Sequence, residues 1–483
     1  MRTIRPDVGS RAHGTGIAVL AIVFFLHASG FSSLCADLVD SRTAGAPEMV
    51  FLDVRDFGAT PNNPGDDDAV YINMALDNAA AKGIDTVYVP AGTWDVATSV
   101  KVPSNTTLRL SNNAILRLKA GARLAYGIVT NRNAAMGDFK TDAGVRITGG
   151  TIDGNNVVPA AGENRGIFLC KCSWSVIEDV TVRDTTSEGI RVLSIDGKRV
   201  SEHVVVRSCA VIRKQYTVEN ILLSTHVDDP RNSAAKPAAT RYCRVEGCYS
   251  SGGSHGIAFS NAGYCAAVNN VCEGNAHRGI ILSPTCEDCI VSGNVVRRAG
   301  STGIHLAYNA RRCVISGNIV TGTVADGSGL GNEGQGIKAY AGFRDLIITG
   351  NQVSSNATDG IALEGGGESA DFVISNNISA ENRRDGIRIF AGKITLEKSH
   401  DISGGTISGN SCRYNRESGI RLGSDHPAAK AVSTSVSGNS LHHNGRWGIH
   451  ADATTGLSIG QNTHDANGSG AENVMGVAGG GSR

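Results

Sequence analysis

The sequence is poor in aromatic and charged side chains and carries no surplus of either sign. Aromatic residues make up 5% of the chain and charged residues 19%, with 45 Lys+Arg against 45 Asp+Glu. This balance excludes the basic surface of a dedicated nucleic-acid binder, so we expect no nucleic-acid partner. Hydrophobic residues still reach 41%, which is enough for a sizeable core and argues against global disorder.

Long hydrophobic runs are absent beyond the first residues. Gly16–Leu26 is apolar, follows three arginines and precedes several small residues, but it is too short to span a bilayer comfortably. The pattern predicts a cleaved secretory signal peptide over residues 1–36, followed by a linker over 37–50. We therefore expect a secreted or periplasmic protein without stable membrane insertion.

Glycine, in contrast, is abundant, and it recurs at a fixed period. The chain has 61 glycines, about twice the usual share, but no three-residue period, which excludes collagen. A Gly-Ile phrase recurs, often at intervals of 23 or 24 residues, with its glycines at positions 166, 189, 256, 279, 303, 336, 360, 386, 419 and 448. Helical periodicity is absent after residue 83, and propeller blades need nearly twice this period. The repeat predicts an all-β, single-stranded parallel β-helix with coils about 4.8 Å apart.

Two further residue types keep the same period. Asparagines follow Ser-Gly or Thr-Gly at positions 294, 318, 351, 410 and 439, where they are expected to stack as a ladder between coils. Four cysteines (Cys243, Cys265, Cys289 and Cys313) also share one repeat position. They are expected to be buried, either as free thiols or with a disulfide formed in an oxidising compartment. The Cys286-x-x-Cys289 pair has no second pair or His cluster nearby, so no zinc site is expected.

The ends of the solenoid have their own patterns. Three aspartates at 66–68 supply a helix N-cap, and an apolar pattern predicts a helix over 68–82 that ends at Gly83. We expect residues 51–96 to form an N-terminal cap over the first coil, and residues 97–466 to form the β-helix. Residues 467–483 are rich in Gly, Ser and Ala and predict a flexible tail.

The cap segment resembles a known superfamily. Asp56-Phe57-Gly58-Ala59, the Asp67-Asp68 cap with its helix, and the run Thr86–Trp94 are similar to the opening of the pectate-lyase-like superfamily, in the version shared by mannuronan C-5-epimerases, polygalacturonase-related proteins and phage tailspikes. The resemblance covers residues 51–96. It implies a right-handed parallel β-helix that acts on an extracellular polysaccharide, but it does not select the reaction.

Stacked coils predict columns of side chains. The residue before each repeat glycine gives a column whose members include Arg165, Glu188, Glu219, His255 and Arg278. Further along the strands come outward positions occupied by Arg191, His305, Lys338, Tyr340, Glu364 and Arg388. Two insertions, at 224–242 and 324–335, lie beside these columns and are expected to turn a flat face into a cleft.

Three functions fit these columns. Proton abstraction at C5 of a uronate needs a base, for which His255 and Tyr340 are candidates, and cations that neutralise the carboxylate, for which Arg191, Arg278 and Lys338 are candidates. Elimination then gives a lyase, and reprotonation from the other face gives an epimerase.

Hydrolysis instead needs two carboxyl groups, and Glu188 with Glu219 are the candidates. Ser254-His255-Gly256 is similar to the Gly-His-Gly element of polygalacturonases, although the paired aspartates of that family are absent. The third function is non-catalytic glycan binding, with His305, Glu364 and Arg388 as further sugar contacts. No metal ligand spacing is evident, but the resemblance allows calcium as an alternative neutraliser of the carboxylate.

Overall fold

The computed structural model describes residues 50–156, 164–214, 218–226, 238–325, 333–395, 398–424 and 429–475. The predicted signal peptide and all but the last residue of the linker lie outside this part of the chain. So do residues 227–237 and 326–332 of the two insertions and residues 476–483 of the tail. No helix in the described ranges is long and apolar enough to cross a membrane.

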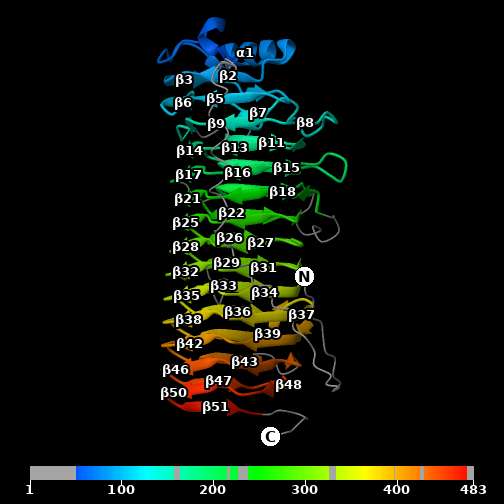
Figure 1. Cartoon of the computed structure of the whole chain (residues 1–483), viewed down its shortest axis with the longest axis vertical. Helices are drawn as coiled ribbons and strands as arrows, with labels where there is room; N and C mark the ends of the chain where they lie inside the picture. Colours follow the sequence, from blue (N-terminus) through cyan, green and yellow to red (C-terminus); the bar gives the residue numbers. More distant parts are fainter. Residues whose placement is uncertain are drawn as a thin grey trace, which may run out of the picture. The chain divides into compact units, whose positions relative to one another are not determined.

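The described residues form a right-handed parallel β-helix, as predicted, with coils stacked from α1 (Asp68–Lys82) to the last strand in Figure 1. Three long sheets run along the stack. Sheet 1 has fifteen strands: β4 (Val100–Val102), β7 (Gly127–Asn131), β11 (Arg165–Cys170), β15 (Ile190–Ser194), β18 (Ile221–Thr225), β22 (His255–Ser260), β26 (Arg278–Leu282), β29 (Thr302–Ala307), β33 (Ile337–Tyr340), β36 (Ile361–Glu364), β39 (Ile387–Thr395), β43 (Ile420–Ser424), β47 (Trp447–Ala451), β51 (Gly470–Val474) and β40 (Lys398–His400), which pairs antiparallel with β39.

Sheets 2 and 3 form the remaining faces of the coils. Sheet 2 has eighteen strands: β1 (Leu52–Asp53), β2 (Thr86–Val89), β5 (Thr107–Leu110), β9 (Arg146–Thr148), β13 (Val176–Glu178), β16 (Val205–Arg207), β20 (Arg244–Glu246), β24 (Ala266–Val268), β27 (Ile290–Ser292), β30 (Ala310–Arg311), β31 (Val314–Ser316), β34 (Phe343–Thr349), β37 (Ser369–Ser375), β41 (Ile402–Ser408), β44 (Ala431–Val432), β45 (Ser435–Ser437), β48 (Thr454–Thr455) and β49 (Ser458–Ile459). Sheet 3 has fourteen strands: β3 (Gly92–Val96), β6 (Ala114–Leu118), β10 (Thr151–Asp153), β14 (Thr181–Arg183), β17 (Ala210–Ile212), β21 (Tyr249–Ser251), β25 (Val271–Glu273), β28 (Val295–Arg297), β32 (Ile319–Thr321), β35 (Gln352–Ser354), β38 (Ile378–Ala380), β42 (Ser411–Arg413), β46 (Ser440–His442) and β50 (Thr463–Asp465). Short pairs, β8 (Asp142–Ala143) with β12 (Cys172–Ser173) and β19 (Thr240–Arg241) with β23 (Ala262–Gly263), lie in the turns between sheets 1 and 2.

The repeat phrases have direct structural causes. A Cβ added at Gly279 would come within 2.2 Å of Val296 Cγ1 and 2.8 Å of the Gly303 carbonyl oxygen in the next coil. A side chain at Gly279 would overlap these atoms, which explains the glycine there, although Asn220 holds the equivalent position on the β18 coil. The isoleucine that follows each of these glycines is fully buried in the core, as Ile280 and Ile304 show.

The predicted asparagine ladder is present. Each side-chain amide donates to the carboxamide oxygen of the next member at 2.9–3.0 Å, along Asn270, Asn294, Asn318, Asn351, Asn377, Asn410, Asn439 and Asn462. The eleven cysteines in the described residues are all buried and form no disulfide. Burial raises the pKa of Cys170 and of Cys172 to about 12, so these thiols stay protonated and pack as small apolar groups.

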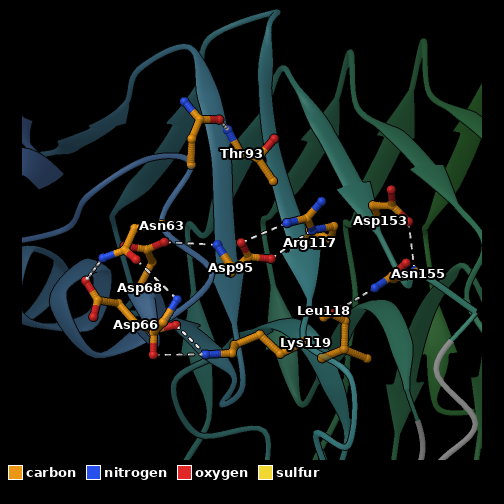
Figure 2. Close-up of polar contacts among 12 residues, drawn as sticks. Asn63, Asp66, Asp68, Thr93, Asp95, Arg117, Leu118, Lys119, Asp153 and Asn155 are labelled. Atoms are coloured by element: carbon orange, nitrogen blue, oxygen red, sulfur yellow. Dashed lines mark hydrogen bonds and ion pairs between the residues drawn. The ribbon is translucent and has the colours of Figure 1, made fainter.

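The N-terminal cap is held by its aspartates. The Asp67 side chain accepts from the Ala69 amide at the start of α1, and Gly83 ends the helix in the left-handed conformation. Asp68 is fully buried and accepts from the Asp95 amide at 2.9 Å (Figure 2), as well as from the Thr60 amide. Asp67 is therefore the N-cap of the expected helix, whereas Asp66 and Asp68 fix the loop before the helix and its contact with β3.

Both predicted boundaries of the solenoid are wrong. Strands β2 and β3 already pair with β5 and β6, so the first coil begins at Thr86 and not at residue 97. At the other end, β51 pairs with β47, so the β-helix extends into the segment expected to be a tail. A polar Gly-rich strand still pairs there because backbone hydrogen bonds to the preceding coil do not depend on side-chain type.

Candidate functional site

The predicted column before the repeat glycines lies in one register. Ile167 pairs with Ile190, Ile190 with Ile221 and Ile221 with Ile257, and His255 pairs directly with Arg278. These pairings align Arg165, Glu188, Glu219, His255 and Arg278 on successive strands of sheet 1. Residues far apart in the sequence are thus neighbours about 4.8 Å apart.

The column does not face outward along its whole length, contrary to the prediction. Glu188 is 5% exposed, and the equivalent residues Gln335, Asp359 and Asp385 are fully buried. The reason is the corner between sheets 3 and 1, where long side chains of the preceding turn fold over the column. Arg384, for example, donates through Nε to Asp359 Oδ1 at 2.7 Å. Only Glu219, His255 and Arg278, together with Trp447 near the C-terminal end, are half-buried members.

Glu188 is locked between two arginines. Its Oε2 accepts from Arg165 Nε and from Ser187 Oγ, both at 2.6 Å, and its Oε1 accepts from Arg191 Nη1 at 2.8 Å. Burial opposes its ionisation, but the charges of Arg191 and Arg165 outweigh burial and lower the pKa of Glu188 to about 2. This carboxylate is fixed in position and charged, and it holds Arg191 at the edge of the neighbouring cavity.

His255 and Glu219 line one cavity of about 460 Å³, together with Arg191 and His226. Burial lowers the pKa of His255 to about 3, and the charge of Arg278 contributes to this shift. Burial raises the pKa of Glu219, and the charge of Glu188 adds to it. At neutral pH the cavity therefore offers a neutral imidazole as a proton acceptor, beside a carboxyl group that is biased toward holding its proton.

A second cavity of about 340 Å³ adjoins the first through Ile281 and Ser283. Arg278 donates through Nε to His305 Nδ1 at 2.6 Å, and Lys338 Nζ lies 2.9 Å from Glu364 Oε2. Burial, with the nearby charge of Arg278, holds the pKa of His305 well below its usual range. His305 is therefore neutral, with the Arg278 guanidinium fixed beside it.

Tyrosines complete the second cavity. The Lys338 ammonium lies 5.1 Å from the centre of the Tyr340 ring, and the Tyr308 ring packs edge-on against Tyr340 at 6.0 Å. Burial raises the pKa of Tyr340, so its phenol stays protonated at neutral pH. In the free protein Tyr340 therefore keeps its proton, whereas the His255 imidazole is neutral.

A third cavity of about 460 Å³ adjoins the first at its N-terminal side through Arg191 and His226. Arg165, Phe168 and Tyr126 line it, with the Tyr126 and Phe168 rings stacked at 5.5 Å. The three cavities share lining residues, so they form one groove along sheet 1 from β11 to β33. We refer to these three cavities together as the groove.

Two predicted contacts lie outside the residues that line these cavities. Glu364 acts as the ion-pair partner of Lys338, and Arg388 stacks on Phe390 at 3.9 Å with Asp385 on its other side. Sequence reasoning missed Glu333, which lies 3.9 Å from Arg278, and Tyr126. Glu333 stands in the predicted 324–335 insertion, and that insertion was the only available signal for it.

The sequence profile of one family, described as "Periplasmic copper-binding protein (NosD)", matches residues 194–369 and 332–477. Together these ranges cover more than half of the chain. The chain belongs to the NosD family.

Individual proteins match shorter segments of the chain than the family profile does. The Bacillus subtilis (strain 168) protein YclG is 27% identical over 183 residues, which cover 34% of this chain and 31% of YclG. The Azotobacter vinelandii mannuronan C5-epimerase AlgE5 is 29% identical over 170 residues, which cover 31% of this chain and 15% of AlgE5. The matches thus span a third or less of these relatives.

A solved structure supports the architecture over most of the chain. The tailspike protein of E. coli bacteriophage HK620, solved in complex with a pentasaccharide, aligns with a TM-score of 0.54 at 14% identity, covering 86% of this chain and 78% of the tailspike. At this identity the likeness concerns the fold. It supports the parallel β-helix fold that the resemblance of residues 51–96 implied.

The description of the NosD family names copper, but the described residues do not fit a copper centre. Within the described ranges, no group of three His, Cys, Asp or Glu side chains could hold a metal ion. His442 and His443 bring their Nδ1 atoms within 3.2 Å, but only as a pair, and the described cysteines are buried in the core. The described ranges likewise contain no cluster of three carboxylates for calcium.

Proposed function

We propose that this NosD-family protein removes the C5 proton of a uronate residue in a polysaccharide, as a lyase or as a C5-epimerase. One observation carries the proposal. His255 is neutral and shares a cavity with Glu219, whose pKa is raised, and with the cation Arg191. Arg278 pairs with His255 in the register of sheet 1. A base, a proton donor and carboxylate-binding cations are the groups that this chemistry needs.

The reaction follows from these groups. Ser254 Oγ lies 3.3 Å from His255 Nδ1, which leaves Nε2 to accept the C5 proton. The electron pair left at C5 spreads into the sugar carboxylate, where Arg191 and Arg278 offset the growing charge. In the lyase reaction the C4–O4 bond then breaks, Glu219 gives its proton to O4, and a C4=C5 double bond remains. In the epimerase reaction no bond to O4 breaks, and Glu219 gives its proton to C5 from the opposite face while His255 keeps the proton that it removed.

The comparisons support this substrate class and compartment. One relative is named a mannuronan C5-epimerase, and a structure with the same fold was solved with a bound oligosaccharide. The family description is periplasmic, in agreement with the signal peptide expected over residues 1–36. Hydrolysis by Glu188 and Glu219 is less well supported, because both Glu188 oxygens are engaged by Arg165, Arg191 and Ser187.

A substrate panel tests the proposal. The protein is incubated with alginate, polygalacturonate and a neutral glucan while ultraviolet absorbance, reducing ends and C5 configuration are followed. New absorbance indicates a lyase, and a change of configuration alone indicates an epimerase. Reducing ends without absorbance indicate a hydrolase and contradict the proposal, as does the absence of all three signals with every uronan.

Variants connect the activity to the site. His255→Ala is expected to lower turnover at least a hundredfold, because general base catalysis contributes about that much or more. His442→Ala, a histidine on sheet 3, is the matched control and should leave turnover unchanged. A chelator should also leave turnover unchanged, because arginines neutralise the carboxylate in this mechanism. Full activity of His255→Ala would remove the site assignment.

A further inference from the structure

Four aromatic rings form a stack on the turns between sheets 1 and 2. Trp174, His203, Tyr242 and Tyr264 occupy equivalent positions on consecutive coils, as the backbone bonds from Trp174 N to Glu202 O and from His203 N to Arg241 O show. The ring centres are 3.8, 5.1 and 5.1 Å apart, with interplanar angles of 10°, 11° and 21°. We refer to these four residues as the ring stack.

The ring stack stands in an unusual backbone conformation. All four residues have φ between 53° and 55°, in the left-handed region that bulky side chains avoid. The same position carries Asn105 and Gly144 on the coils before the stack and Asp288 on the coil after it, and these residue types adopt left-handed turns readily. The left-handed turn thus recurs along the stack of coils, and what distinguishes these four coils is the aromatic side chain placed on it.

The two ends of the ring stack differ. At the Tyr264 end, Asp288 occupies the next coil, interacts with the Tyr264 hydroxyl and pairs with Arg312 at 2.7 Å. At the Trp174 end, the preceding coil carries Gly144, which has no side chain to cover the indole. Trp174 is 64% exposed although His203 covers one of its faces. The exposed area of Trp174 therefore includes the indole face turned away from His203.

We propose that the open face of Trp174 binds a pyranose ring of the polysaccharide, at a site separate from the groove. The C–H face of a pyranose ring packs well on an exposed indole face. The residues around the ring stack are polar, and Ser173, Glu202 and Arg241 are half-buried there. They offer hydrogen-bond partners for sugar hydroxyls. An apolar protein surface would leave these polar groups without partners. The inference rests on the proposed function for the nature of the polymer.

The location adds an argument for a second point of attachment. Trp174 follows β11 by four residues, so its indole lies on the turn that adjoins the N-terminal end of the groove. A polymer held both in the groove and at Trp174 gains affinity from two linked contacts without any new catalytic group. The site therefore retains long chains rather than assisting the chemistry.

Fluorescence tests the site directly. Of the three tryptophans, Trp94 is buried and Trp447 is half-buried, so Trp174 dominates quenching by iodide. In His255→Ala protein, where turnover does not interfere, a mannuronate or galacturonate hexasaccharide is expected to protect Trp174 from iodide. Affinity electrophoresis in gels that contain alginate or polygalacturonate then compares variants. Trp174→Ala should weaken retention about tenfold, the size of a well-stacked ring contact.

A blocking variant separates binding from folding. Gly144→Asn suits the left-handed φ of 66°, and its Cβ meets only the movable Asn105 side-chain oxygen at 2.5 Å. It should cover the indole, abolish protection by the hexasaccharide and weaken retention as Trp174→Ala does. Tyr414→Ala, which removes a 54% exposed aromatic residue in the same left-handed conformation on another turn, is the matched control and should change neither signal.

The outcomes separate this site from the proposed chemistry. Protection of Trp174 without turnover of any uronan supports the ring-stack site and contradicts the chemistry. Turnover with unchanged retention in both Trp174→Ala and Gly144→Asn overturns the ring-stack site and leaves the chemistry standing. Equal loss of retention in Tyr414→Ala would also overturn it, because the effect would then not be specific to the indole.

Discussion

Two titratable side chains on the same cavity have pKa values that move in opposite directions. Burial lowers the pKa of His255 and raises that of Glu219, because in each case the low dielectric penalises the charged form. The result is an uncharged base beside a carboxyl group that holds its proton more tightly than an exposed glutamate does. Such a pair can pass one proton in and another out without first exchanging protons with water.

The acid limb of the pH–rate profile is expected to lie at low pH. The neutral form of His255 is the active one and its pKa is about 3, so kcat/KM should stay high well below pH 6.5. Arg278→Gln removes one of the charges that depress this pKa. We expect its acid limb to move upward, toward the usual histidine range, besides a loss of rate. Arg298→Gln, which alters an exposed arginine paired with Glu273, should leave the limb in place. An unshifted limb in Arg278→Gln would contradict the electrostatic account.

Asp385 provides a prediction about stability. Burial, with the nearby charge of Asp359, raises its pKa to about 7, so the folded state keeps a proton that the unfolded state loses above about pH 4. Its contribution to stability is therefore present at low pH and is lost as pH rises through 7. Asp385→Asn should raise the Tm at pH 8 by about 2–4 °C and have little effect at pH 4. Asp371→Asn, at an exposed carboxylate, is the control for calorimetry at both pH values, and a gain that does not depend on pH would refute the assignment.

At the scale of elements, asparagine ladders join the coils at two turns. Beside the predicted ladder, a second one runs along Asn356, Asn382, Asn415, Asn444 and Asn467 at 2.9–3.0 Å. Its members do not follow a Ser-Gly or Thr-Gly pair, so that phrase does not reveal them. Both ladders satisfy buried backbone groups that the turns leave without strand partners.

Removal of one ladder member should be costly. Asn318→Ala deletes the hydrogen bonds that its side chain donates to Asn351 and to the Val291 carbonyl. It also leaves the Asn294 backbone N–H, which donates to Asn318 Oδ1 at 2.9 Å, without an acceptor. Buried groups left without partners cost about 1–3 kcal/mol each, so we expect a clear loss of unfolding free energy in denaturant titrations. Ser316→Ala, two residues away with a half-buried hydroxyl, should cost far less. Equal losses for the two variants would show that the ladder adds no stability of its own.

At the scale of the whole described chain, the groove follows the axis along which the coils stack. Seven strands of sheet 1, from β11 to β33, pass beneath it, which corresponds to about 29 Å at the spacing of parallel strands. The cations Arg165, Arg191, Arg278 and Lys338 are distributed along this length. An extended anionic polymer fits such a distribution better than a compact ligand does.

Substrate length and salt should therefore both matter. We expect kcat/KM on uronate oligomers to rise with length up to about six residues and then to level off. The seven strands are separated by six spacings, and each spacing accommodates roughly one sugar. Raising the ionic strength about tenfold should increase KM more than it lowers kcat, because salt screens the two half-buried cations, Arg191 and Arg278. Steady-state kinetics on sized oligomers would check both effects. A rate that is independent of length would place the substrate in one cavity only.

The solenoid, its period, the cap helix over residues 68–82 and the alignment of Glu219, His255 and Arg278 could all be predicted from the order of the residues. The repeat phrases are local, and stacking converts a fixed period directly into register. Which members of the column meet solvent could be read only from the folded chain. Ion pairs such as Glu188 with Arg165 and Arg191, and side chains that fold over the column from the corner turns, vary between coils and leave no periodic signal. Burial and pairing depend on the sum of many neighbours, and that sum exists only once the coils are stacked.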